Sequence, residues 1–148
     1  MSVKHPVELL LSDGSLPQLY LPSPPSEPIP CNVRKYTLAI LSMLGLKQYQ
    51  FDWMPSSTTL GLCVKDSYIA ISNEFFNHPN PRVWKTVLHE IAHALEYALY
   101  GQGGHGESWK RCCKAIGLNG TGDAESNGSE PYPSAELLLK TMLDTYYA

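Results

Sequence analysis

The sequence predicts an α+β fold, in which a small sheet and several helices share a single hydrophobic core. Two stretches with helical periodicity enclose three short segments of β-type composition, and this order is typical of α+β proteins. The chain has 148 residues, of which 43% are hydrophobic and 17% are charged, so its length and composition suit one globular domain.

The first helix is expected over residues 32–46. Its apolar residues, among them Val33, Tyr36 and Ile40, recur at helical spacing along the segment. Gly45 then suits the end of the helix, because glycine adopts the left-handed conformation that often terminates helices.

Three short strands are expected at 49–53, 60–64 and 68–72. Each segment is rich in aromatic, β-branched and other apolar residues, and turn-forming residues separate them. The connections are short, and short connections favour antiparallel pairing. We therefore predict an antiparallel three-stranded sheet.

A long helix is expected from Pro81 or Arg82 to Tyr100. Proline fits the first turn, and the apolar residues of the segment cover a wide surface at helical spacing. Gly101 ends this helix, a glycine-rich loop with the sequence GQGGHG follows, and a further helix is expected over 107–116.

The two ends of the chain differ in composition from its centre. Residues 1–30 contain a proline-rich segment, which predicts an extended arm, because proline disfavours helix and central strand. Residues 31–118 form the predicted domain. Residues 119–134 have the composition of a flexible linker, and residues 135–148 form a short amphipathic helix in this prediction.

Composition and charge indicate the compartment. A net charge of −3 excludes a basic surface over the whole protein of the kind that binds nucleic acid. The longest apolar run is far too short to span a membrane, and the N-terminus does not resemble a secretory signal, so we expect a cytoplasmic protein without membrane contact. The cysteines form no C-x-x-C pair, which favours reduced thiols over a zinc ribbon; they are Cys31, Cys63, Cys112 and Cys113.

The motif H-E-x-x-H, formed by His89, Glu90 and His93, lies within the long predicted helix. Residues four apart share one helix face, so the two imidazoles can point at a common metal ion. Zinc takes nitrogen ligands of this type, and catalytic zinc sites combine three protein ligands with a water molecule. Glu90 lies about 100° around the helix from His89, so its carboxylate can stand beside the metal and act as general base.

A third protein ligand must come from elsewhere in the chain. His105 is the preferred candidate, because glycines on both sides of it allow the loop to turn sharply and approach the helix. Glu107, at the start of the next helix, is an alternative. Glu96 is a weaker one, because it follows His93 by only three residues on the same helix.

These residues resemble the SprT-like metallopeptidases, a family that includes bacterial SprT proteins and eukaryotic Spartan proteases. The resemblance rests on HEIAHALEY and on GHGESWKRCCKAIG, in which His105, Gly106 and Trp109 match the family's H-G-x-x-W pattern. The strand region before the helix is similar as well, and the resemblance covers residues 33–118.

The resemblance implies a zincin-like domain that hydrolyses peptide bonds in a protein or peptide substrate. It implies one Zn²⁺ ion held by His89, His93 and His105, with Glu90 as the catalytic general base. It also implies that an edge strand near 68–72 holds an extended substrate by strand addition. The chain lacks the C-terminal zinc ribbon of many members, so we expect a stand-alone member of the kind found on phages and mobile elements.

Two other functions fit the same residues. In a zinc-stabilised binding module without catalysis, Cys112 or Cys113 would supply a fourth ligand and close the site. In a DNA-associated protease, Lys110, Arg111 and Lys114 would contact phosphates, although such a cluster is more often a solvated helix face.

Three aromatic residues near the motif have open roles. Trp109 is expected either under the metal-binding loop or as an ordinary core residue. Tyr97 or Tyr100 could donate a hydrogen bond to an oxyanion, but a tyrosine on a buried helix more often has a structural role.

Overall fold

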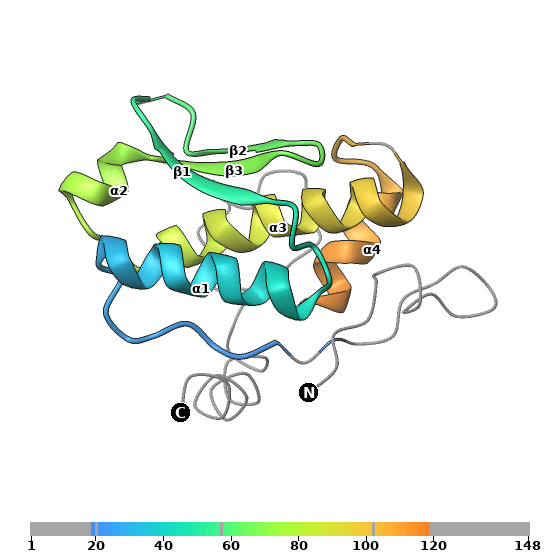
Figure 1. Cartoon of the computed structure of the whole chain (residues 1–148), viewed down its shortest axis with the longest axis horizontal. Helices are drawn as coiled ribbons and strands as arrows, with labels where there is room; N and C mark the ends of the chain where they lie inside the picture. Colours follow the sequence, from blue (N-terminus) through green and yellow to red (C-terminus); the bar gives the residue numbers. More distant parts are fainter. Residues whose placement is uncertain (1–18, 20, 57, 102, 119–148) are drawn as a thin grey trace.

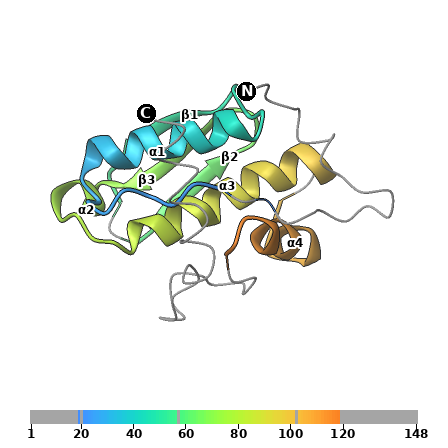
Figure 2. The same ribbon diagram turned by 90° about the horizontal axis from the view of Figure 1, so that it is seen from below.

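The computed structural model describes residues 19, 21–56, 58–101 and 103–118, and these residues form an α+β fold. A three-stranded sheet lies over two helices that run side by side in the same direction, and a last helix packs against the long one (Figures 1 and 2). The elements are α1 (Pro30–Met43), β1 (Gln50–Met54), β2 (Gly61–Val64), β3 (Tyr68–Ser72), α2 (Asn73–Asn77), α3 (Val83–Tyr100) and α4 (Glu107–Ala115). The predicted α+β class is therefore confirmed, as are the helices and strands predicted within the described residues.

The sheet is mixed, so the prediction of a purely antiparallel sheet was wrong. The strand order is β1-β3-β2; β2 pairs with β3 in antiparallel fashion, but β1 pairs with β3 in parallel. β2 therefore lies on the far side of β3 from β1, about two strand spacings or roughly 10 Å away. A short connection therefore does not require that consecutive strands pair, and sequence neighbours pair in only about two-thirds of cases.

β3 is the central strand of the sheet, and its mostly apolar composition is consistent with this position. Its segment, YIAIS, is buried from Ile69 to Ser72, as expected for a strand covered on both faces. Helix α2 follows directly and was not among the predicted elements. The backbone N–H of Glu74 donates to the Ser72 side chain, which caps this short helix.

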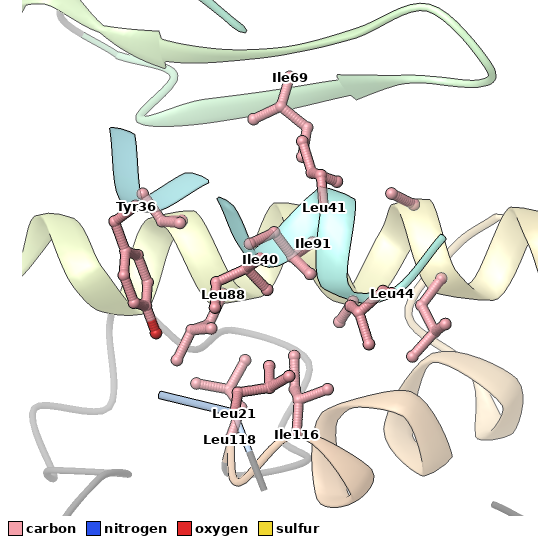
Figure 3. Close-up of a cluster of buried hydrophobic side chains, with 14 of the residues drawn as sticks. Leu21, Tyr36, Ile40, Leu41, Leu44, Ile69, Leu88, Ile91, Ile116 and Leu118 are labelled. Atoms are coloured by element: carbon pink, nitrogen blue, oxygen red, sulfur yellow. The ribbon is translucent and has the colours of Figure 1, made fainter. Parts of the chain in front are cut away.

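The hydrophobic core lies between the sheet, α1 and α3 (Figure 3). Ile69 from β3 points towards Leu41 of α1, while Leu88 and Ile91 of α3 meet Ile40 of α1. Each of these side chains is almost completely buried, and burial of one Leu or Ile contributes about 1.5–3 kcal/mol. Helix α3 is buried over its whole first part, from Val83 to Glu96, so it is the central element of the domain.

The segment before α1, residues 19 and 21–29, covers the side of the core that faces down in Figure 1. It is extended, as its prolines predict, and Leu21 is only 3% exposed. The backbone N–H of Leu19 donates to the Ala115 carbonyl at 2.7 Å, and the Tyr36 hydroxyl donates to the Pro22 carbonyl at 2.8 Å. The segment is thus attached to α1 through Pro22 and to the end of α4 through Leu19.

The remaining predictions on the chain ends lie outside the described residues. These are the first part of the arm, the linker over 119–134 and the helix over 135–148. Among the helices that the structure describes, none is both long enough and apolar enough to cross a membrane.

Candidate metal centre

Helix α3 presents His89 and His93 side by side on one face. The helix is unbroken from Val83 to Tyr100, so the four-residue spacing brings the two rings to centroids 4.9 Å apart. Both histidines are almost buried, with 6% and 9% of their surface exposed. The apolar packing of α3 thus fixes two imidazoles in place before any ligand binds.

The glycine-rich loop brings His105 to the same point. Gly101 ends α3 in the left-handed conformation, with φ of 72°, and Gly104 has φ of 143°, so the chain reverses within a few residues. Gly103 lies so close to the Tyr97 ring that an added Cβ would stand 2.5 Å from the tyrosine hydroxyl. The reversal leaves His105 Nε2 3.2 Å from the Nε2 atoms of both His89 and His93.

This arrangement suits a metal ion. One ring nitrogen from each of the three histidines lies within 4.8 Å of the others. Zinc–nitrogen bonds of 2.0–2.1 Å in a tetrahedral site place neighbouring nitrogens about 3.3 Å apart, which agrees with the observed 3.2 Å. Converging lone pairs repel one another, and a cation between them removes that repulsion. The sequence-based grouping of these three histidines is matched by the structure.

Burial also sets the protonation of His93. Burial, as the largest cause, together with the neighbouring His89 and His105, lowers the pKa of His93 to about 3. The His93 imidazole is therefore neutral at neutral pH and keeps a lone pair for a metal ion. The same burial raises the pKa of the Glu96 carboxyl, and a hydrogen bond from Ser108 is the largest opposing effect.

Trp109 of α4 forms the floor of the cluster. Its ring centroid lies 4.9, 5.5 and 4.8 Å from those of His89, His93 and His105. Its side chain is completely buried, and its indole N–H donates to the His89 carbonyl at 3.5 Å. Both expectations for this tryptophan therefore hold, because it is a core residue and also supports all three imidazoles.

Within the described part of the chain, the group that could hold a metal ion consists of three histidines and no fourth residue. Cys112 and Cys113 are buried in α4 and do not belong to the group, and burial raises the pKa of the Cys112 thiol to about 12. The two acidic alternatives to His105 also lie outside the group, because Glu107 is exposed and Glu96 contacts the far side of His93. The arrangement is that of an open site.

Glu90 lies next to the cluster and is 4% exposed. Its Oε2 atom is 4.0 Å from His89 Nε2. Gly61, the first residue of β2, covers it so closely that an added Cβ would stand 2.7 Å from that oxygen and 2.8 Å from Thr86 Cγ2. Gly61 was not among the site residues predicted from the sequence. A glycine in a strand is a signal of close approach by another group, and here that group is the carboxylate.

The sheet edge beside the cluster belongs to β2, so the prediction of an edge strand near 68–72 was wrong. β3 is paired on both sides and has no free edge. The Ser72 N–H donates to the Leu60 carbonyl at 2.9 Å, so these two residues form a hydrogen-bonded pair of the β2–β3 ladder. Hydrogen-bonded and non-hydrogen-bonded pairs alternate along an antiparallel ladder. By this alternation, the backbone N–H and C=O groups of Gly61 and Cys63 point away from β3, towards the free edge.

The other residues singled out in the sequence lie farther from the chemistry. Arg111 and Lys114 are exposed on α4 and Lys110 is half-buried, an arrangement that fits a solvated helix face. DNA binding by these residues stays a prediction. The Tyr97 ring packs against the loop at Gly103, which is a structural role.

Of three comparisons with known proteins, the one with protein families gives a match. Neither a curated protein nor a solved structure matches the chain significantly. The sequence model of the SprT-like family matches residues 32–127, which include most of α1, the sheet, α3, the three histidines and α4. Because the match covers most of the chain, the protein belongs to the SprT-like family.

Proposed function

We propose that this protein is a zinc-dependent metalloendopeptidase that hydrolyses peptide bonds in extended protein segments, with Glu90 as general base. The observation that carries the proposal is the convergence of three Nε2 atoms beside a buried carboxylate. Membership of the SprT-like family supports the same reaction class.

His89, His93 and His105 would hold the metal ion. When bound, zinc polarises the scissile carbonyl and lowers the pKa of a coordinated water molecule to about 7. Imidazole also binds other transition metals, so the identity of the metal is part of the proposal. The missing fourth ligand among the described residues favours an open catalytic site over a closed structural one.

Glu90 would move the protons of the reaction. Its carboxylate lies between α3 and Gly61 of β2, with Oε2 4.0 Å from His89 Nε2. From this place it can accept a proton from the attacking water and then deliver it to the leaving amine. Close approach of Gly61 restricts the position of the carboxylate, which reduces the cost of orientation during the reaction.

The free edge of β2 would bind the substrate. The outward-facing backbone groups of Gly61 and Cys63 can pair with an extended peptide as an added strand. Gly61 also contacts Glu90, so a peptide paired there passes beside the metal cluster. This mode requires an exposed backbone, so we expect unfolded or extended segments to be cleaved and compact domains to resist.

Substitution of Glu90 by glutamine tests the proposal. We expect Glu90→Gln to retain stoichiometric zinc by elemental analysis, while cleavage of a denatured protein falls by about 10²–10⁴-fold, the usual contribution of a general base. His105→Ala should lose both zinc and cleavage. Glu107→Gln is the matched control, because that carboxylate is exposed, and it should match the wild type. Full activity in zinc-loaded Glu90→Gln would refute the role of Glu90.

A further inference from the structure

Glu96 is a buried carboxylate that the proposed reaction does not use. It lies one turn after His93 on α3, and only 1% of its surface is exposed. A buried carboxylate is costly unless donors surround it, so the groups that contact Glu96 are informative. It is not one of the residues that converge on the metal position.

Three contacts surround this carboxylate. Oε1 lies 3.5 Å from Nδ1 of His93, the ring nitrogen that faces away from the cluster. The Ser108 hydroxyl donates a short hydrogen bond to Oε2. The backbone N–H of Gly104 also donates to the carboxylate. Helix α3, the glycine-rich loop and α4 therefore all meet at Glu96.

The positions of these partners in the chain connect Glu96 to two of the three histidines. Gly104 immediately precedes His105, and Ser108 follows it in the first turn of α4. The carboxylate thus holds the loop on both sides of His105. At the same time, a proton on Nδ1 of His93 pointing at Oε1 leaves the lone pair on Nε2, which lies 3.2 Å from His105 Nε2.

We propose that Glu96 is a positioning residue for the metal centre, which orients the His93 ring through Nδ1 and anchors the loop that carries His105. This inference rests on the proposed metal site but not on peptide hydrolysis. Carboxylates that orient metal-binding histidines in this way typically change metal affinity by about 10–100-fold when they are removed. Glu96 thereby has a definite role, different from the ligand role considered from the sequence.

Zinc affinity, measured by competition with a chromogenic chelator, tests the inference. We expect Glu96→Leu to lower the affinity by about 10–100-fold. Glu96→Gln should lower it less, because the amide oxygen still accepts from Nδ1–H, and this isosteric variant carries the test if Glu96→Leu does not fold. Ser108→Ala removes one donor to the carboxylate and should cause a smaller loss. Glu107→Gln is the exposed control from the same turn of α4.

A second measurement separates orientation from general destabilisation. In the metal-free protein, the ring-nitrogen chemical shifts of His93 should show the Nδ1–H tautomer, and Glu96→Leu should increase the Nε2–H form. Wild-type affinity in folded Glu96→Leu, or a wild-type His93 that carries its proton on Nε2, would overturn the role of Glu96 alone. A wild-type chain that binds no zinc would instead overturn the proposed metal centre.

Discussion

The two edges of the sheet differ in whether another part of the domain covers their outward-facing backbone groups. At the β1 edge, the Arg34 guanidinium of α1 donates to the outward-facing Phe51 carbonyl at 3.2 Å and lies 5.9 Å from the centre of the Phe51 ring. At the β2 edge, the described residues supply no backbone partner to the outward side of Gly61 and Cys63. Exposed edges invite pairing with other chains, and proteins often block them. Here the blocked edge is the one remote from the metal cluster.

The comparison suggests why the β2 edge is open. Glu90 and the histidine cluster lie against β2, and Gly61 is small enough to let the strand approach the carboxylate closely. An edge that binds a peptide, as we propose for β2, cannot also be blocked by a side chain. Substitutions at the two edges should therefore have opposite consequences, catalytic at β2 and structural at β1.

The largest effect at the edges is expected from Gly61→Ala. The new Cβ would stand 2.7 Å from Glu90 Oε2 and 2.8 Å from Thr86 Cγ2, so the carboxylate must move. Displacement of a catalytic group by about 1 Å can cost about 100-fold in rate. We expect kcat to fall by that order while zinc content stays at the wild-type level. An unchanged kcat would show that the position of Glu90 is not set by Gly61.

A smaller effect is expected from Cys63→Pro. The N–H of Cys63 points away from β3, so proline removes a donor to the substrate but no bond of the β2–β3 ladder. Loss of one such hydrogen bond, worth about 0.5–1.5 kcal/mol, should lower kcat/KM for an extended peptide by about 2- to 10-fold.

The control for this substitution is the neighbouring position. Leu62 has its N–H directed at β3, so Leu62→Pro should break the ladder and lower thermal stability sharply. If both proline variants lose stability equally and Cys63→Pro, where folded, cleaves normally, then the free edge of β2 does not bind the substrate backbone.

The smallest effect on catalysis is expected from Arg34→Met at the opposite edge. Methionine keeps much of the apolar stem but cannot donate to the Phe51 carbonyl, so the free energy of unfolding should fall by about 1–2 kcal/mol in a denaturant titration. Because this edge is remote from the histidine cluster, kcat/KM per folded molecule should not change. A large loss of specific activity would mean that the two edges are coupled.

Much of the candidate site could be predicted because its signals are local. His89, Glu90 and His93 lie on one helix, and their relation follows from helical geometry alone. The ends of the two helices could also be predicted from local signals, since Gly45 and Gly101 both adopt the left-handed conformation that stops a helix. His105 was the harder inference, and the glycines around it were sufficient to indicate that its loop could return to the helix.

Apart from the short helix α2, the features that were missed depend on contacts between distant residues. The strand order places β3 between β1 and β2, which short connections alone do not determine. The closeness of Gly61 to Glu90 appears only when β2 packs on α3. Likewise, Glu96 resembles a spare ligand in the sequence, and only the position of Ser108 and Gly104 reveals that it faces away from the point where the three histidines converge.

The sequence by itself determined the elements other than α2, the histidine motif and the reaction class that the motif suits, because periodicity and helix geometry act over a few residues. Only the tertiary structure decided which strand has the free edge, what contacts each carboxylate and whether a fourth ligand reaches the cluster among the described residues. Those outcomes depend on packing, in which burial of the shared core selects one arrangement of elements from several that the local signals allow.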